Sequence, residues 1–196
     1  MIKVFIAGEG RNELGGWYDE EPYRQQMPGV IEAMLRKLKQ DGWQVAGGIR
    51  WAKIRKYQFG MRGRGDYRNV CAAALLAREN CCQVLAFVRD RDGNTARQRQ
   101  VENAIQEQER DNPQGPRIIG GMAIEKLESW LLSMTGRSRS EDKRRPENEL
   151  GSLGIRNTGE MVDLVNSTDL STIPRDAHSL RNWLERARQA LTFCNH

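Results

Sequence analysis

Acidic residues stand directly after short apolar runs at three places in this chain. Glu9 and Glu13 follow the first run, and Asp90 and Asp92 follow a later one. Glu125 and Glu128 follow the last. Several unpaired carboxylates in one pocket repel one another unless a cation binds among them. Carboxylate oxygens are hard ligands that favour Mg²⁺ or Mn²⁺. If folding brings the three groups together, the sequence predicts a site for one of these ions.

Each acidic group also has an explanation that involves no ligand. Glu9 lies between two glycines and is typical of a turn, and Asp90 and Asp92 are typical of helix caps and turns. Glu125 and Glu128 would be favourable at the positive end of a helix dipole. These explanations treat each group separately. The metal-site hypothesis accounts for the position of all three at the ends of successive strands.

The elements that must position these acids follow from the apolar pattern. Short apolar runs alternate with helix-like stretches, which predicts an α/β fold with a largely parallel sheet. The predicted strands are residues 2–7, 44–49, 83–88 and 117–124. The predicted helices are residues 30–38, 66–77, 96–110 and 125–134. Ligands of parallel sheets bind at the carboxyl ends of the strands, which is where the acidic groups lie.

Three segments are expected along the chain. Residues 1–134 form the α/β domain, and residues 135–150, which are polar and lack periodicity, are expected to be a flexible linker. Residues 151–196 are expected to be a helical extension that packs on the same domain, with Asp176 capping its last helix. The apolar stripe of that helix consists of Leu180, Trp183, Leu184, Ala187 and Leu191.

The composition favours a folded cytoplasmic protein. Hydrophobic residues make up 38% and charged residues 29% of the 196 residues, which suffices for one sizeable core. The longest apolar runs have the length of a strand, far short of the roughly 20 residues that a membrane-spanning helix needs. The first residues enter a strand pattern without the features of a signal peptide. The net charge of +5, carried chiefly by arginine, mildly favours nucleic acid as a partner.

A basic segment between the second strand and the next helix is a candidate nucleic-acid contact. Its basic residues are Arg50, Lys53, Arg55, Lys56, Arg62, Arg64 and Arg68. Its aromatic residues are Trp51, Tyr57, Phe59 and Tyr67. Positive charge binds phosphates and aromatic rings stack on bases, so the segment is expected to contact a nucleic-acid backbone. The alternative is a solvated loop whose aromatic residues anchor it to the core.

Other known motifs fit the same residues poorly. Gly8 and Gly10 begin a dinucleotide-binding fingerprint, but Glu13 stands in the place of its third glycine. The aspartates after the third strand begin a calcium-binding loop, but Thr95 stands where that loop needs glycine and Val101 where it needs glutamate. The cysteines form no CxxC pair, so a structural zinc site is not expected.

Taken in order, Glu9-Gly10 and Asp90-Arg-Asp92 resemble the Toprim domain of topoisomerases, primases and OLD-family nucleases. The chain looks most like small stand-alone Toprim-like proteins of bacteria, a family of unknown function. That likeness rests on Gly-Glu-Gly-Arg-Asn-Glu at residues 8–13 and Ile-Glu-Lys-Leu-Glu-Ser-Trp-Leu-Leu at residues 124–132. The resemblance covers residues 1–134 and implies a Rossmann-like sheet of about four mostly parallel strands with helices on both faces.

The resemblance also implies a role for each matching residue. Glu9 matches a glutamate that acts as general acid or base or holds a metal, and Asp90 and Asp92 match metal-binding aspartates. Glu128 matches the acid that completes the site, and Glu13 matches a second, supporting acid. The implied catalytic residues are therefore Glu9, Asp90, Asp92 and Glu128, and these four with Glu13 would hold Mg²⁺ or Mn²⁺.

The resemblance implies a Mg²⁺-dependent nuclease or nuclease-like effector. It also implies an ATPase partner and a place in a bacterial anti-phage system. One alternative is a non-catalytic subunit that binds nucleic acid or an ATPase. Another is a metal-dependent phosphatase, because residues 87–95 resemble the aspartyl-phosphatase motif of the haloacid dehalogenase family, although Asn94 is inserted. The chain departs from the Toprim-like pattern in an insertion over residues 15–28 and at Lys126, where relatives often carry an acid.

Overall fold

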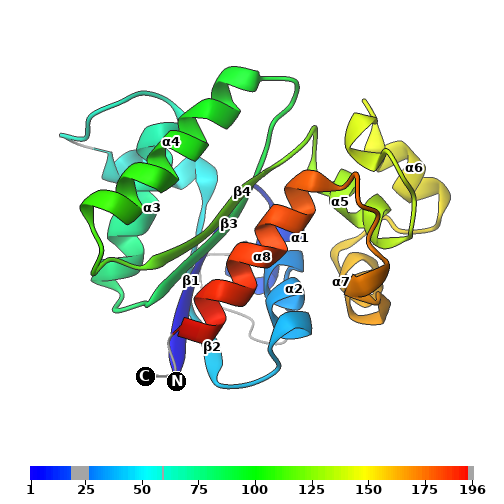
Figure 1. The fold of residues 1–196 in the computed structure, drawn as a ribbon, viewed down its shortest axis with the longest axis horizontal. Coiled ribbons are helices and arrows are strands. Elements are labelled where there is room, and N and C mark those ends of the chain that lie inside the picture. The colour runs from blue at the N-terminus through cyan, green and yellow to red at the C-terminus, as the bar shows by residue number, and fades with distance from the viewer. Residues whose placement is uncertain (19–26, 59, 194–196) are drawn as a thin grey trace.

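Four parallel strands form the central sheet of this computed structural model (Figure 1). They are β1 (Ile2–Gly8), β2 (Trp43–Arg50), β3 (Val84–Asp90) and β4 (Arg117–Ala123), in the order β2-β1-β3-β4. The structure describes residues 1–18, 27–58 and 60–193, so residues 19–26 of the insertion lie outside it. The predicted α/β class and strands are confirmed, with boundaries that differ by 2 residues at most.

Helices cover both faces of the sheet, as expected. In Figure 1, α3 and α4 lie on one face and α2 and α8 lie on the other. The α-helices are α1 (Arg11–Leu14), α2 (Val30–Leu38), α3 (Asp66–Glu79), α4 (Thr95–Asp111), α5 (Leu127–Met134), α6 (Pro146–Ser152), α7 (Thr158–Ser167) and α8 (His178–Phe193). Short 3₁₀ helices are η1 (Gly15–Tyr18), η2 (Trp51–Tyr57), η3 (Ser140–Asp142) and η4 (Leu170–Thr172).

The two central strands are apolar because both of their faces are buried. Residues 84–88 of β3 are all buried, and their side chains alternate between the two core clusters on either side of the sheet. Phe87 packs with α3 and α4, whereas Val88 packs with α5 and α8. Within the described residues, no helix combines the length and apolar character needed to cross a membrane.

Residues 135–150 are folded, which contradicts the expected linker without regular structure. The segment contains η3 and most of α6, and it buries Ser140, Glu141 and Leu150. Pro146 occupies the first turn of α6, where its missing N–H and fixed φ cost nothing. The sequence of this segment shows no helical periodicity because its two helices are short. Polar side chains such as Ser140 and Glu141, and not a long apolar stripe, hold it against the domain.

The last helix is capped by a residue from that same segment. Glu141 accepts hydrogen bonds from the backbone N–H groups of Ser179 (3.0 Å) and Leu180 (3.2 Å) and from the Ser179 hydroxyl (2.6 Å). Asp176, which was expected to cap α8, instead accepts from the backbone N–H of Arg139 at 2.8 Å. The prediction that Asp176 caps α8 was therefore wrong. A capping residue from a distant segment, such as Glu141, leaves no signal in the sequence next to the helix.

The C-terminal extension packs on the sheet through α8. All five residues of its predicted apolar stripe are buried, which confirms that stripe. Trp183 packs against Trp130 of α5 with a ring-centroid separation of 6.0 Å and donates its Nε1–H to the carbonyl of Phe87 at 2.9 Å. Arg186 donates to the carbonyl of Gly120 in the edge strand β4 at 2.9 Å. The extension is therefore part of the same domain.

Removing the Glu141 carboxylate tests the importance of the folded segment. Glu141→Ala leaves two N–H groups of α8 unsatisfied, so we expect it to lower the free energy of unfolding by about 1–3 kcal/mol. The neighbouring Asp142, whose side chain is 64% exposed, is the control. Asp142→Ala is expected to change the free energy by less than about 0.5 kcal/mol. Urea unfolding measures both, and equal effects would contradict the capping role.

Candidate active site

The predicted acids meet at the carboxyl ends of β1, β3 and β4. Glu9 directly follows β1, Asp90 ends β3, and Glu128 lies in the first turn of α5 after β4. β3 pairs with β1 on one side and β4 on the other. The backbone N–H of Asp90 donates to the Glu9 carboxylate at 2.9 Å. This confirms that Glu9 and Asp90 lie at the ends of adjacent parallel strands.

Asp90 is the electrostatic centre of the group. Burial, and then repulsion from Glu9, Glu13 and Glu128, raise the pKa of its carboxyl to about 8, against one opposing hydrogen bond from the backbone N–H of Leu127. That bond is 2.9 Å long. We call Glu9, Glu13, Asp90 and Glu128 the acid cluster. Because the other three acids each raise the pKa of Asp90, the four carboxyl groups lie close enough to repel one another.

Glu13 belongs to this cluster more closely than a supporting role implies. Only 6% of the residue is exposed, and burial followed by repulsion from Glu9 and Glu128 raises its pKa. Its carboxylate accepts from the backbone N–H of Gly10 at 2.8 Å. A Cβ on Gly8 would lie 2.6 Å from the Cβ of Glu13, so glycine is required there for the two segments to approach.

Glu128 is held in a more mixed environment. Burial raises its pKa, Lys126 opposes this, and Glu147 adds to it. Lys126 donates to Glu147 of α6 at 3.1 Å. Lys126 therefore brings a positive charge to the place where Toprim-like proteins often carry an acid, and the folded segment 135–150 contributes Glu147 beside the site.

Asp92, unlike Glu9, Glu13 and Glu128, is not one of the main causes of the raised pKa of Asp90. Its carboxylate pairs with Arg97 at 2.9 Å, and its side chain is 47% exposed. Its backbone has a φ of 49°, in the left-handed region, and its N–H donates to the carbonyl of Glu125 at 3.0 Å. Glu125 also has a positive φ, 65°, and pairs with Arg91 at 2.6 Å. These contacts fix the loops after β3 and β4 to each other, at the expense of strained backbone.

Three residues that the sequence analysis did not single out surround the cluster. Asp66, the first residue of α3, is buried and pairs with Arg89 (3.3 Å) and Arg97 (3.0 Å). It also accepts from the indole N–H of Trp51 at 2.8 Å. Arg89 forms a second ion pair with Glu9, and Arg97 donates to the carbonyl of Asp90 at 2.7 Å. The alternating Arg and Asp of residues 89–92 was the available signal for one of these three residues, Arg89.

The acid cluster has the donor chemistry of a hard-cation site. Four carboxyl groups that repel one another would be stabilised by Mg²⁺ or Mn²⁺. Among the described residues, however, no three His, Cys, Asp or Glu side chains are arranged as a set that could hold a metal ion. Glu9 is turned to Arg89 and Asp92 to Arg97. A cation at this site would therefore have to draw ligands away from arginine partners.

The basic segment is partly anchored and partly exposed. Trp51 is buried, and the hydroxyl of Tyr67 is hydrogen-bonded to Glu107 of α4, so these two rings hold the segment to the domain. Arg50 lies over the ring of Tyr18 with 4.7 Å between the guanidinium carbon and the ring centroid. Phe59 lies outside the described residues. The exposed basic residues of the segment are Arg55, Lys56, Arg62 and Arg64.

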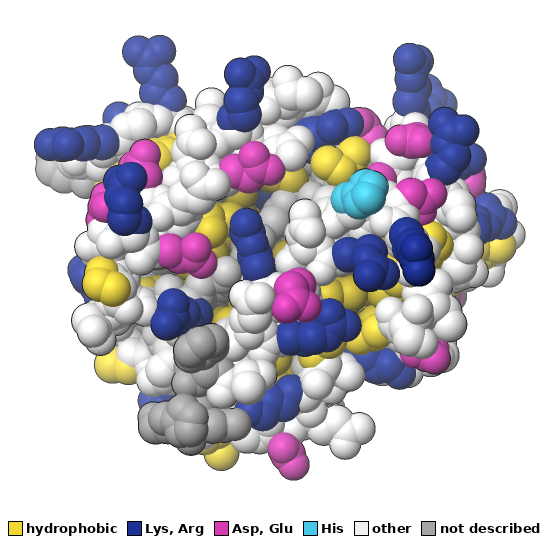
Figure 2. Space-filling view, in the orientation of Figure 1, with side chains coloured by type: hydrophobic (Ala, Val, Ile, Leu, Met, Phe, Trp, Pro, Cys, Tyr) yellow, Lys and Arg dark blue, Asp and Glu magenta, His cyan; other side chains and the backbone are white. Residues whose placement is uncertain are grey.

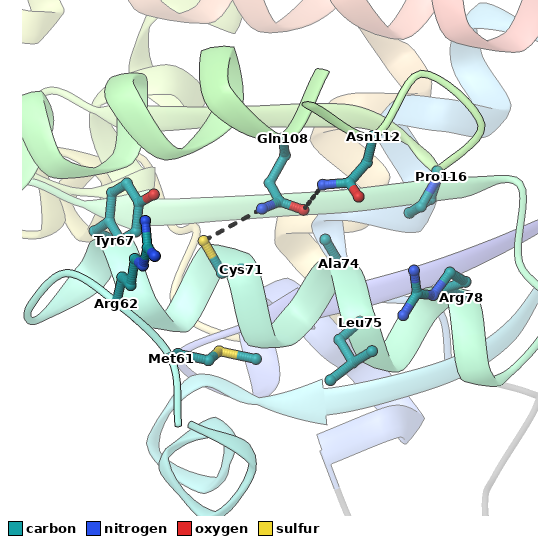
Figure 3. A pocket seen from close by; sticks show the side chains of 11 residues that line it. Met61, Arg62, Tyr67, Cys71, Ala74, Leu75, Arg78, Gln108, Asn112 and Pro116 are labelled. Atoms are coloured by element: carbon teal, nitrogen blue, oxygen red, sulfur yellow. Dashed lines mark hydrogen bonds between the residues drawn. The ribbon is translucent and has the colours of Figure 1, made fainter. Parts of the chain in front are cut away.

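Charge elsewhere on the surface is mixed. On the face shown in Figure 2, Lys and Arg side chains are spread widely, with Asp and Glu side chains between them. A cavity of about 310 Å³ between α3 and α4 is lined by Arg62, Tyr67 and Cys71 on one side and Gln108 on the other (Figure 3). Gln108 donates to the sulfur of Cys71 at 3.5 Å. No Asp or Glu lines this cavity, so it is separate from the acid cluster.

Substituting Gly8 tests the packing of the acid cluster. The added Cβ of Gly8→Ala would collide with Glu13, so we expect the free energy of unfolding to fall by about 1–3 kcal/mol. Gly151→Ala in α6 is the control, because a Cβ there would meet no atom within 4 Å. In a helix, alanine is favoured over glycine by up to about 1 kcal/mol, so this variant should be as stable or more so. Urea unfolding distinguishes the two, and an unaffected Gly8→Ala variant would contradict the packing.

The raised pKa of Asp90 predicts a particular pH dependence of stability without divalent cations. Between the ordinary value of 3.8 and about 8, the folded protein retains a proton that the unfolded chain releases. The contribution of this group is therefore full below pH 3.8 and is lost as pH rises towards 8. Asp90→Asn cannot ionise and should gain stability relative to wild type, by more than about 1 kcal/mol, across that range.

Urea unfolding in EDTA at about pH 5 and about pH 8 measures this difference. Asp163→Asn, at an exposed position of α7, is the matched control. Its free energy of unfolding should differ from that of wild type by the same amount at both pH values. If the difference between Asp90→Asn and wild type were the same at both pH values, Asp90 would not be the buried acid described above.

Comparison with known proteins identifies no relative of this chain. No protein-family model, curated protein or solved structure matches it.

Proposed function

We propose that this protein is a Mg²⁺- or Mn²⁺-dependent nuclease that hydrolyses phosphodiester bonds. The observation that carries the proposal is the acid cluster at the carboxyl ends of β1, β3 and β4, in which burial and then repulsion from three other carboxyl groups raise the pKa of Asp90 to about 8. Such repulsion opposes folding unless the site binds something positive. The resemblance of residues 1–134 to Toprim domains supports the same reaction.

In this proposal, Asp90 and Glu13 are the first ligands of the cation, and Glu9 and Glu128 complete its shell. The bound ion would polarise the phosphodiester and activate water. Asp90 is oriented for this by the N–H of Leu127, and Glu13 is oriented by the N–H of Gly10. Glu9, whose side chain is 32% exposed, is the acid best reached by a substrate and is our choice for proton transfer.

The surrounding arginines would admit a polyanion to an acidic site. Arg89, Arg91 and Arg97 all come from β3 or the loop and helix that follow it, and each pairs with an acid of the site or its rim. A nucleic-acid phosphate would compete for these guanidinium groups, because arginine binds phosphate oxygens in the same bidentate way as carboxylates. In this proposal, Asp92 holds Arg97 in position and is not itself a ligand of the cation.

A non-catalytic subunit is the second candidate. It is favoured by the arginine partners of Glu9 and Asp92 and by the lack, within the described residues, of a set of acids arranged to hold a metal. In that case, the domain would bind nucleic acid or an ATPase partner without cutting, within an anti-phage system of the kind that the Toprim resemblance implies. A phosphatase is less favoured, because Asn94 is inserted before the threonine of the aspartyl-phosphatase motif.

Cation binding and cleavage are tested with wild type, Asp90→Asn and Glu13→Gln. Mg²⁺ or Mn²⁺ should raise the melting temperature of wild type, because a ligand that binds only the folded state stabilises it. Both variants should lose most of this increase. Wild type should cleave plasmid DNA, single-stranded DNA or structured RNA in the presence of the cation and not in EDTA, and each variant should be slowed by at least about a hundredfold.

Glu79→Gln, at an exposed position at the end of α3, is the control and should behave as wild type. Equal cleavage by wild type and Asp90→Asn would indicate a contaminating nuclease. A cation-induced rise in melting temperature without cleavage of any substrate, alone or with an ATPase partner, would favour the non-catalytic subunit. No rise in melting temperature would exclude the metal site itself.

A further inference from the structure

A cavity of about 490 Å³ lies beside the acid cluster, where α3 and α4 begin. Its charged lining residues are Arg55, Arg89 and Arg97 against a single acid, Asp66. The remaining lining residues are four amide side chains and a glycine, so no hydrophobic side chain from the described part of the chain lines it. A cavity of this composition is suited to an anion with several oxygens rather than to an apolar ligand.

Two of the three arginines are held rigidly in the cavity wall. The buried carboxylate of Asp66 pairs with Arg89 through one oxygen and with Arg97 through the other. Trp51 and Asn69 donate to that carboxylate at 2.8 Å and 3.0 Å, which fixes its orientation. Arginines whose positions are fixed before binding lose little conformational entropy when a ligand arrives.

These arginines retain donors for a ligand. Each guanidinium has five N–H groups. The hydrogen bonds of Arg97 to the protein come from Nη1, and its Nε pairs with Asp66, so Nη2 is available. Arg55 is exposed, and its side chain makes no ion pair with any residue that the structure describes. Arg55 is therefore the least committed positive charge in the cavity.

Glycine is needed where the chain enters the cavity. Gly65, the residue before α3, has a φ of 53°, and a Cβ there would lie 2.6 Å from the side-chain oxygen of Gln100. That oxygen accepts from the N–H of Asp66 at 3.0 Å. The close approach holds the starts of α3 and α4 together, and both helix dipoles add positive potential at this end.

We propose that this cavity binds one phosphate of a nucleic-acid strand through Arg55, Arg97 and Arg89. A volume of about 490 Å³ falls in the range of small-molecule sites, so a sugar fits beside the phosphate. The cavity shares its wall with the acid cluster, since Arg89 also pairs with Glu9 and Arg97 also donates to the carbonyl of Asp90. A strand held here would present its neighbouring phosphate to Asp90.

This inference rests on the proposed function for the identity of the ligand as a strand, and its test is independent of cleavage. Binding of a thymidine oligonucleotide without terminal phosphate is measured by fluorescence anisotropy in EDTA, over a series of salt concentrations. Arg55→Gln should weaken binding by about tenfold, since it removes one charge-assisted phosphate contact. It should also reduce the slope of log affinity against log salt by about one.

Arg78→Gln is the matched control, because Arg78 is exposed on the same helix as Asp66 but lines the other cavity. It should leave affinity and slope unchanged. Arg97→Gln should also weaken binding, and its melting temperature shows whether it is folded. If Arg97→Gln is unfolded, Arg55→Gln alone decides the test. The Arg55 side chain has no ion pair to lose within the described part of the chain.

Thymidine monophosphate and inorganic phosphate are the other probes. Both should compete for the cavity only at concentrations far above that of the oligonucleotide. Monophosphate binding as tight as that of the oligonucleotide, and sensitive to Arg55→Gln, would overturn the assignment to a strand in favour of a free nucleotide. Equal oligonucleotide binding by wild type, Arg55→Gln and Arg78→Gln would overturn the site. Binding lost in Arg55→Gln without cleavage by wild type would support this site while contradicting the nuclease.

Discussion

The crowding of like charge at one edge of the sheet is the constraint on which the rest of this structure depends. A parallel sheet directs the ends of β1, β3 and β4 to the same edge, where Glu9 follows β1, Asp90 ends β3 and Glu128 lies in the first turn of the helix after β4. Burial and then repulsion from the neighbouring acids raise the pKa of Asp90 to about 8. The repulsion can be offset by protonation, by nearby cationic side chains or by a bound cation. The raised pKa of Asp90 favours the first, the ion pair of Glu9 with Arg89 is an example of the second, and the third is the basis of the proposed activity.

The arginines around the cluster offset only part of this charge, because they are shared. Asp66 binds both Arg89 and Arg97, which would otherwise be free to neutralise Glu9 and the end of β3 more completely. The same sharing leaves guanidinium N–H groups directed to the neighbouring cavity. Asp66 therefore separates the charge into an acidic region at the strand ends and a basic region at the starts of α3 and α4. A phosphodiester strand needs both, since its phosphates must be attracted before any one of them reaches an acidic centre.

The sequence predicted the strands, the order of acidic groups along them and the apolar stripe of α8, because each depends on periodicity within a short segment. The burial of Glu13 beside the other acids could not be predicted, since its close approach to β1 depends on the absence of a Cβ at Gly8. Asp92 shares a motif with Asp90, but its positive φ turns it to Arg97. Asp66 begins a predicted helix, but nothing near it in sequence indicates its two arginine partners. Partners that lie more than twenty residues away in sequence, such as Arg89, leave no periodic signal.

The folded segment 135–150 changes how the acidic edge is enclosed. Its Glu147 pairs with Lys126, and its Glu141 caps α8, whose Trp183 in turn donates to the carbonyl of Phe87 near the end of β3. The C-terminal helices are thus connected to the strands that carry the acids through directional hydrogen bonds, and not by apolar packing alone. Such bonds weaken steeply when donor and acceptor move apart. A shift of α6 would therefore weaken the bond to Lys126, and a shift of α8 would weaken the bond to β3. This connection gives the C-terminal region a physical means of influencing the acid cluster without contributing a residue to it.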